Sequence, residues 1–137
     1  MFPKKKILAV DDEASACEMY EDSLPVLGYD ITCVTSAKKA KEHLLKNVPD
    51  LILMDIMMPD QDGISLTKEI HTNTQTAHIP IITVSALSDA ATLNDALLFG
   101  AVDYLVKPFE METLKLKIER ALTLAERRKT TVAAKKA

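Results

Sequence analysis

Short apolar runs alternate along the chain with longer stretches of helical period. Each run is rich in Val, Ile or Leu, as is typical of strands that are buried on both faces. The runs cover residues 7–10, 31–34, 51–54, 79–84 and 102–106. Pro80 lies near the start of its run, where a strand tolerates proline. The pattern therefore predicts five buried strands.

The stretches between the runs carry apolar residues at helical spacing, and most have a start or stop signal. The signals are Gly28 after the first helix (residues 13–27), Ser36 before the second, Asp62 or Gly63 at the start of the third, and Ser88 and Gly100 around the fourth. The fifth helix has the clearest apolar stripe, at residues 111, 114, 118, 121, 122 and 125. Five helices are therefore predicted, each following a strand.

Five repeats of strand and helix predict an α/β fold with a five-stranded parallel sheet, doubly wound by helices on both faces. We expect one domain over residues 1–128, followed by a basic tail or truncated linker over residues 129–137. Ligands of such sheets bind beyond the carboxyl ends of the strands, where the winding direction reverses. The residues that follow the strands are therefore the first place to look for chemistry.

Charge and cysteine content narrow the classes of function. A net charge of −3 argues against direct nucleic-acid binding by this domain. The apolar run after Lys4–Lys6 is too short for a signal peptide or a membrane span, so we expect a cytoplasmic protein that does not bind a membrane. Cys17 and Cys33 show no pairing pattern and no metal-ligand spacing, which favours two reduced core thiols.

Polar side chains follow every predicted strand except the second. Asp11 and Asp12 follow the first strand, Asp55 the third, Ser85 the fourth and Lys107 the fifth. These side chains should converge at one edge of the sheet, where three carboxylates would repel one another unless a cation lies among them. Hard oxygen ligands without a nearby His or Cys favour Mg²⁺ shared with a phosphate.

A carboxylate beside a metal ion, a lysine and a hydroxyl is equipped to attack phosphorus and form an acyl phosphate. Each residue also has an ordinary structural explanation: Asp11 and Asp12 as helix caps, Asp55 as the start of a turn, Ser85 as a loop hydroxyl, and Lys107 as a solvated charge. Their coincidence at the relevant strand ends favours the functional interpretation.

Five segments resemble the receiver domains of two-component response regulators. They are Ile-Leu-Ala-Val-Asp-Asp-Glu (7–13), Leu-Ile-Leu-Met-Asp-Ile-Met-Met-Pro (51–59), Asp-Gly (62–63), Ile-Pro-Ile-Ile-Thr-Val-Ser-Ala (79–86) and Gly-Ala-Val-Asp-Tyr-Leu-Val-Lys-Pro-Phe (100–109). The resemblance extends over residues 5–124 and implies a flavodoxin-like fold with strand order 2-1-3-4-5, as in the chemotaxis regulators.

The resemblance implies a role for each candidate residue of the acidic cluster. Asp55 would be the phosphoacceptor, taking a phosphoryl group from a sensor histidine kinase or a histidine phosphotransfer protein. Asp12, Asp55 and the backbone carbonyl of Met57 would bind Mg²⁺, and Asp11 would act largely through water. Asp60, together with Asp62, adds negative charge after the acceptor, which could alter the choice of phosphodonor.

The same resemblance implies a conformational switch. Lys107, joined to Pro108 by a cis bond, would pair with the phosphoryl group, and Ser85 would move to donate a hydrogen bond to it. Tyr104 would then favour an inward rotamer. The readout surface would be the fourth helix, fifth strand and fifth helix, including Val106 and Lys117. Met57 and Leu87 would tune hydrolysis of the acyl phosphate.

Three readings of the whole chain remain open. It is a stand-alone signalling module that binds a partner when phosphorylated, or the amino-terminal regulatory domain of a longer DNA-binding or enzymatic response regulator. A phosphatase of the haloacid dehalogenase kind also uses an aspartyl nucleophile, but it needs a second Asp where Met57 stands. We therefore expect no enzymatic turnover beyond self-catalysed phosphoryl acceptance and slow autodephosphorylation.

Overall fold

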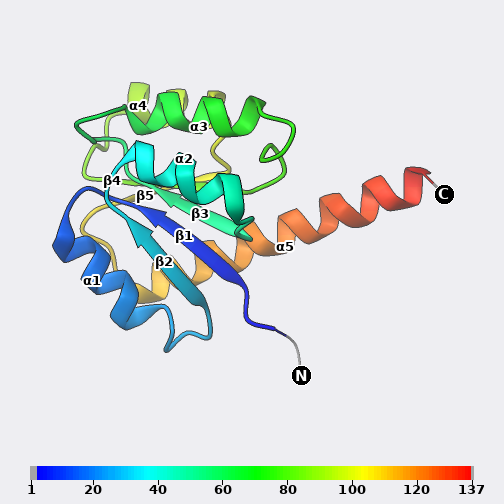
Figure 1. Ribbon diagram of the computed structural model, residues 1–137, viewed down its shortest axis with the longest axis horizontal. Helices are drawn as coiled ribbons and strands as arrows, with labels where there is room; N and C mark the ends of the chain where they lie inside the picture. The colour runs from blue at the N-terminus through cyan, green and yellow to red at the C-terminus, as the bar shows by residue number, and fades with distance from the viewer. Residues whose placement is uncertain (1–2, 137) are drawn as a thin grey trace.

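A computed structural model of the protein describes residues 3–136 as a parallel sheet between two layers of helices (Figure 1). The sheet has five strands in the order β2-β1-β3-β4-β5, and all four strand pairs are parallel. This is the flavodoxin-like arrangement that the sequence predicts. The carboxyl ends of all the strands therefore meet at one edge.

The observed elements follow the predicted runs closely. The strands are β1 (Lys6–Val10), β2 (Asp30–Val34), β3 (Leu51–Met54), β4 (Ile81–Ser85) and β5 (Asp103–Val106). The helices are α1 (Ala14–Ser23), α2 (Ala37–Lys46), α3 (Gly63–Thr72), α4 (Ala90–Leu98) and α5 (Met111–Lys136). β4 begins only after Pro80, because proline cannot donate to the ladder.

Alternate residues of the central strands face opposite layers. On one face, strand residues pack with α1 and α5 in a core of Ile7, Ala9, Leu51, Leu53, Ile82, Val84, Leu105, Tyr20, Leu24, Leu114, Ile118 and Ala121. On the other face, α2 and α3 cover Leu8, Val10, Ile52, Met54 and Ile81, while α4 lies over β5. Burial on both faces explains why β1, β3 and β4 read as continuous apolar runs.

The two edge strands depart from the prediction of complete burial. Asp30 and Thr32 of β2 are exposed, and its other residues are only half-buried. In β5, Asp103 and Val106 are half-buried at either end of a buried pair. The prediction was wrong here because β2 and β5 form the two edges of the sheet, where each strand has one neighbour.

The helix starts are mostly those predicted from capping residues. The Ser36 hydroxyl accepts a hydrogen bond from the Lys39 amide (3.1 Å), and the Asp62 carboxylate accepts one from the Ile64 amide (2.9 Å). The predicted cap of α4 was wrong by one residue. Asp89, not Ser88, accepts from the Thr92 amide at the start of that helix (3.0 Å).

The cysteines are not the separate reduced thiols that the sequence favoured. Cys17 of α1 and Cys33 of β2 form a disulfide, with Cα atoms 5.5 Å apart. The β1-α1-β2 crossover packs α1 against β2, which brings together two residues that are 16 apart in sequence. That juxtaposition has no signature in the spacing of the cysteines alone.

The helical backbone of α5 continues to Lys136, past the boundary expected at residue 128. Its C-terminal half projects beyond the sheet (Figure 1). The side chains from residue 129 onward lie outside the described part of the structure, so the division into domain and tail remains a prediction. Within the described residues, no helix combines the length and apolar character needed to cross a bilayer.

Candidate functional site

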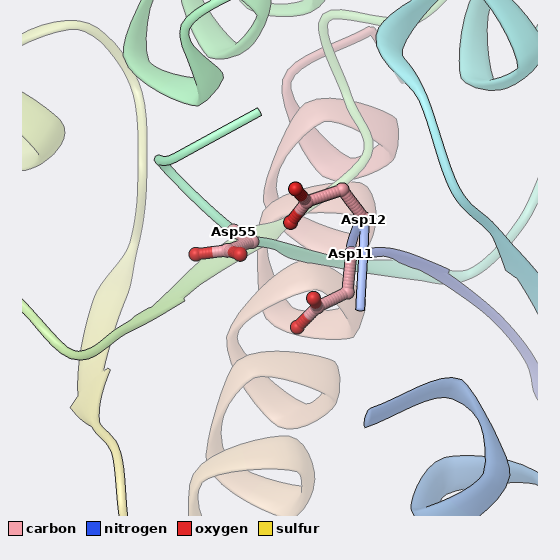
Figure 2. Close-up of side chains that lie close together, drawn as sticks. All are labelled: Asp11, Asp12 and Asp55. Atoms are coloured by element: carbon pink, nitrogen blue, oxygen red, sulfur yellow. The ribbon is translucent and has the colours of Figure 1, made fainter. Parts of the chain in front are cut away.

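Three carboxylates meet at the carboxyl edge of the sheet (Figure 2). Asp11 and Asp12 follow β1, and Asp55 follows β3, which pairs with β1. Each offers an oxygen within 4.8 Å of the others'. Asp11 and Asp55 are only 1% and 6% exposed, whereas Asp12 is exposed. The predicted convergence of these residues is confirmed.

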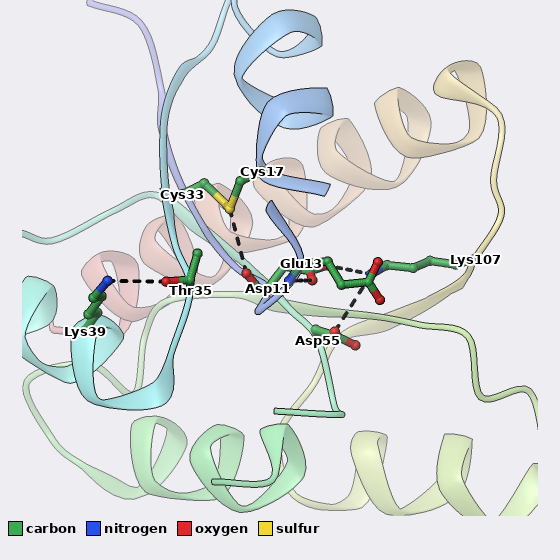
Figure 3. Close-up of a disulfide and its surroundings, with 8 residues drawn as sticks. All are labelled: Asp11, Glu13, Cys17, Cys33, Thr35, Lys39, Asp55 and Lys107. Atoms are coloured by element: carbon green, nitrogen blue, oxygen red, sulfur yellow. Dashed lines mark hydrogen bonds and ion pairs between the residues drawn. A yellow bond between two sulfur atoms is a disulfide. The ribbon is translucent and has the colours of Figure 1, made fainter. Parts of the chain in front are cut away.

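Lys107, which follows β5, contacts two carboxylates of this cluster. Its Nζ atom lies 2.5 Å from Oδ2 of Asp11 and 3.8 Å from Oδ2 of Asp55 (Figure 3). Burial alone would lower the pKa of Lys107, but its hydrogen bond to Asp11 and the surrounding carboxylates raise that pKa overall. The ammonium is therefore held charged beside the candidate nucleophile.

Opposing effects act on the pKa of the Asp55 carboxyl group. Its pKa is raised to about 6, chiefly by burial: Lys107 lowers it, the charge of Asp11 raises it, and hydrogen bonds from the backbone amides of Ile56 and Met57 lower it. Three carboxylates share one lysine here, so the cluster holds more acidic than basic groups. A further cation at this point would relieve the repulsion.

The donor set fits a hard divalent cation. Asp12 and Asp55 offer carboxylate oxygens on the open side of the cluster, while Asp11 is engaged with Lys107. Oxygen ligands without nitrogen or sulfur favour Mg²⁺ or Ca²⁺ over transition metals. The acidic cluster of a Mg²⁺ site is therefore present, as the sequence predicts.

Ser85 lies at the end of β4 beneath this cluster and is fully buried. Its hydroxyl accepts a hydrogen bond from the Leu87 amide (3.2 Å), and its carbonyl accepts one from the Lys107 amide (2.8 Å). The bond between Lys107 and Pro108 is cis, as expected. The ends of β4 and β5 are thus joined where they carry the hydroxyl and the ammonium.

Tyr104 of β5 points into the protein. It is 7% exposed, packs with Ile56, Ala96 and Ala101, and donates its hydroxyl to the Leu87 carbonyl (2.6 Å). Burial raises its pKa, and the Ser85 hydroxyl opposes that shift. The structure therefore contains the inward tyrosine that the sequence interpretation assigned to the phosphorylated state.

The loop between β3 and α3 is fastened to α2 by a residue whose role the sequence did not reveal. The Asp60 carboxylate accepts hydrogen bonds from the amides of Ala37 (3.1 Å) and Lys38 (3.0 Å), the first residues of α2. These hydrogen bonds lower the pKa of Asp60. The carboxylates of Asp60 and Asp62, expected to add negative charge near the acceptor, are therefore both engaged at helix N-termini.

Gly63 permits the same loop to return closely over the backbone of Asp55. A Cβ atom at this position would lie 1.9 Å from the backbone carbonyl oxygen of Asp55. The Gly63 amide donates to the Ile56 carbonyl (2.8 Å), which fixes the first turn of α3 against the end of β3. Only glycine fits this approach, so the residue positions Asp55 without taking part in chemistry.

An open groove of about 620 Å³ adjoins the cluster. Its lining includes Asp12, Met57, Pro59, Ile64 and Leu87, and the Met57 side chain is 61% exposed. Met57 and Leu87 line this groove together with Asp12. The role that the resemblance implies for them, tuning hydrolysis of the acyl phosphate, remains a prediction.

The combination of a doubly wound sheet, a carboxylate cluster at its carboxyl edge, and a lysine and a hydroxyl from the next two strands defines a receiver domain. The sequence matches the family model of the response regulator receiver domain over residues 7–119. The chain belongs to this family and is a receiver domain of two-component signal transduction.

Curated relatives are longer proteins. The chain is 37% identical over 125 residues to the regulatory protein AtoC of Escherichia coli (strain K12), covering 90% of this chain and 26% of AtoC. It is 36% identical over 119 residues to the protein named "Probable transcriptional regulator ycf27" of Porphyridium aerugineum, covering 87% and 48%. The chain thus spans half or less of the length of these relatives.

Solved receiver structures superimpose on nearly the whole domain. A response regulator from Chloroflexus aurantiacus J-10-fl matches with a TM-score of 0.84 and 31% identity, covering 88% of this chain and 99% of that one. A CheY-like receiver domain protein from Methanospirillum hungatei JF-1 matches with a TM-score of 0.85 and 25% identity, covering 92% and 99%. The fold of this domain is therefore a complete receiver fold.

Proposed function

We propose that this domain accepts a phosphoryl group on Asp55 from the phosphohistidine of a sensor kinase or of a histidine phosphotransfer protein. The observation that carries the proposal is the position of Asp55, a buried carboxylate between Lys107 and two other carboxylates at an open edge of the sheet. Asp11 is also buried beside Lys107, but its carboxylate is already engaged by Lys107 (2.5 Å) and by the Glu13 amide (3.0 Å), which favours Asp55 as the acceptor.

Asp55 acts as the nucleophile. One of its carboxylate oxygens forms the new bond to phosphorus as the bond from phosphorus to the donor imidazole nitrogen breaks, and the imidazole takes up a proton. Lys107, 3.8 Å from Asp55, neutralises charge on the equatorial phosphoryl oxygens. Asp12, Asp55 and the Met57 carbonyl would hold Mg²⁺, with Asp11 acting through water. The ion supplies further charge stabilisation at those oxygens.

Phosphorylation adds a charge of about −1.5 to −2 and strong acceptor oxygens at Asp55. Ser85 would give up the amide of Leu87 and donate its hydroxyl to the phosphoryl group. Tyr104, which donates to the carbonyl of Leu87, would be held inward more often. Both hydrogen bonds end on the same residue, so a local charge biases one loop between two states.

The readout surface would comprise α4, β5 and α5. Leu97, Leu98 and Leu116 expose 46%, 76% and 54% of their surface there, while Lys117 pairs with Asp103 at 2.9 Å between α5 and β5. Val106 is half-buried in the same region. Exposed leucines beside a charged pair suit a protein or effector-domain partner, rather than nucleic acid or a membrane.

The domain would act in the cytoplasm as a switch and not as an enzyme with external substrates. Self-catalysed phosphoryl acceptance and slow autodephosphorylation would be its only chemistry. The second candidate is the amino-terminal regulatory domain of a longer DNA-binding or enzymatic response regulator. The observation that supports this second candidate is that the chain matches only 26% of AtoC and 48% of ycf27, so that in those relatives the matching region is part of a longer protein.

The test is intact-mass spectrometry after incubation with acetyl phosphate, with and without Mg²⁺. We expect a single phosphoryl adduct that requires Mg²⁺ and is lost in Asp55→Asn. Asp50→Asn is the matched control, because Asp50 lies at the other end of β3 and accepts a hydrogen bond from the Lys6 amide.

An adduct that persists in Asp55→Asn would move the phosphoacceptor to another residue. No adduct with either acetyl phosphate or phosphoramidate would contradict the phosphorylation mechanism and favour a receiver fold that binds its partner constitutively.

A further inference from the structure

The disulfide lies directly beside the acidic cluster (Figure 3). Cys17 is in the first turns of α1, and Cys33 is the residue before the last in β2. The segment that carries Asp11 and Asp12 runs from the end of β1 to the start of α1, and the Asp11 amide donates to the carbonyl of Val34 at the end of β2 (3.0 Å). A covalent bond therefore joins the two elements that flank the acidic segment.

Short contacts connect this disulfide to Asp11. The Cys17 sulfur lies 3.8 Å from the Asp11 carbonyl oxygen, and the Asp11 amide donates to the Val34 carbonyl, one residue after Cys33 (3.0 Å). The Glu13 amide donates to the Asp11 carboxylate (3.0 Å), and the Cys17 amide donates to the Glu13 carbonyl (3.2 Å). Movement of α1 away from β2 would disturb these contacts together.

We propose that Cys17 and Cys33 form a redox site whose disulfide tightens Mg²⁺ binding by holding Asp11 and Asp12 in their clustered positions. This inference deepens the proposed function, because it takes the acidic cluster to be a Mg²⁺ site. The receiver domain would then integrate two inputs, phosphoryl transfer at Asp55 and the thiol redox state beside it.

The oxidant is a low-molecular-weight disulfide such as oxidised glutathione. Cys33 is half-buried on the edge strand, whereas Cys17 is 7% exposed, so the Cys33 thiolate attacks first. It forms a mixed disulfide and releases one thiolate of the oxidant. The Cys17 thiolate then attacks the Cys33 sulfur and releases the second. Two electrons pass to the oxidant, and the two cysteine protons end on its two thiols.

The direction of the effect follows from repulsion within the acidic cluster. Three carboxylates whose oxygens lie within 4.8 Å repel one another when no cation lies between them. In the reduced protein, only non-covalent contacts oppose the separation of α1 from β2, namely the packing of α1 in the core and the hydrogen bonds around Asp11, so the acidic segment can spread more easily. The disulfide excludes those spread conformers, so less conformational entropy is lost when Mg²⁺ binds.

We expect the oxidised protein to bind Mg²⁺ about fivefold more tightly than the reduced protein, at the lower end of typical coupling between sites. Coupling between two sites is reciprocal, so saturating Mg²⁺ must favour the disulfide by the same factor. For a two-electron couple, about fivefold corresponds to a shift of about 20 mV in the midpoint potential, toward more negative values.

Isothermal titration with MgCl₂ tests this on the full chain, poised fully oxidised or fully reduced in defined glutathione buffers. Thiol counting under denaturing conditions verifies each state. Cys17→Ser and Cys33→Ser are the matched variants, and each should bind Mg²⁺ like the reduced protein in both buffers. The comparison of the two states of the natural sequence needs no variant, so a folding defect in either variant does not decide the result.

Equal Mg²⁺ dissociation constants for the two states would overturn the inference and leave the proposed function intact. So would two titratable thiols that persist in excess oxidised glutathione. Absence of Mg²⁺ binding in both states would overturn the inference together with the proposed Mg²⁺ site. A midpoint potential that shifts with Mg²⁺ in the expected direction would support the coupling independently of phosphorylation.

Discussion

The two ends of the sheet carry similar charged residues in very different surroundings. At the amino ends of the strands, Lys5 lies 3.3 Å from Glu126, and the two side chains are 44% and 57% exposed. At the carboxyl ends, Lys107 lies 2.5 Å from Asp11, and the two side chains are 21% and 1% exposed. Both pairs join a lysine to an acid across many residues, but only the second is removed from water.

Burial therefore separates an ordinary surface from a reactive site in this domain. Solvent screens the exposed pair at the amino ends, so its contribution to stability is small. At the carboxyl ends, burial raises the pKa of Asp55 to about 6 despite the nearby Lys107, and the contact with Asp11 raises the pKa of Lys107 despite its burial. Substitutions at matched positions of the two ends should separate these two regimes.

The largest difference is expected for the lysines. Lys107→Ala should slow phosphorylation of the protein by acetyl phosphate by about 10²- to 10³-fold, because it removes charge stabilisation at the transferred group. The measurement is the rate of adduct formation by intact mass at saturating Mg²⁺. Lys5→Ala, at the amino ends, should leave that rate unchanged. A Lys107→Ala rate close to that of the natural sequence would contradict the catalytic role of this lysine.

Two glycines offer the next contrast. Gly63→Ala should lower the free energy of unfolding by about 3 kcal/mol, since the new Cβ would lie 1.9 Å from the Asp55 carbonyl oxygen and force the backbone apart. Gly28→Ala should cost about 1 kcal/mol, because its φ of +96° is strained for alanine but the space around it is open. Urea denaturation of both variants gives the comparison. Equal costs would show that the close approach over Asp55 is not rigid.

Asp55→Asn should stabilise the metal-free protein at pH 7, by on the order of 1–2 kcal/mol after allowance for the lost attraction to Lys107. The pKa of Asp55 is raised from 3.8 to about 6 by folding, so the folded state binds more protons than the unfolded state between these values. Natural-sequence stability therefore falls as pH rises through this window, and the asparagine variant escapes that loss.

Urea denaturation in EDTA between pH 3.5 and pH 7.5 measures this difference, because that range includes both pKa values. The advantage of Asp55→Asn should shrink toward zero at the acid end, where the aspartate is largely protonated in both states. Asp50→Asn at the other end of β3 is the control. An advantage of Asp55→Asn that is independent of pH would assign it to packing instead of charge.

The smallest effect is expected for the exposed pair. Lys5→Ala should change the free energy of unfolding by less than about 0.5 kcal/mol, because both side chains of the pair remain largely solvated. The same urea titration measures it at low and high salt. A larger, salt-sensitive loss would show that the amino ends of the sheet are also electrostatically coupled.

Sequence patterns predicted the strands and the convergent residues because both follow from burial. A strand covered on two faces must be apolar throughout, so Leu51–Met54 stands out and Asp55 is conspicuous as the residue that breaks the run. The edge strand β2 was less well predicted, since its residues are partly solvated and the helical layers do not enclose it.

Contacts between segments that are distant along the chain could not be predicted from the sequence. The disulfide joins residues 16 apart, and Asp60 caps a helix 23 residues earlier in the chain. Neither pairing leaves a local signature, because each depends on how α1 and α2 pack beside their neighbours. The misplaced cap of α4 has a different cause: Ser88 and Asp89 are both good capping residues, and the register of one residue is decided by the loop that precedes them.

The cap that Asp60 provides has a practical consequence. The amide protons of Ala37 and Lys38 belong to α2, yet the acceptor that protects them comes from the loop that follows Asp55. Their rates of hydrogen exchange with solvent thus report on opening of the loop between β3 and α3 as well as on fraying of α2. Exchange of these two amides can therefore be used to follow the loop between β3 and α3 without a label and without a substitution near Asp55.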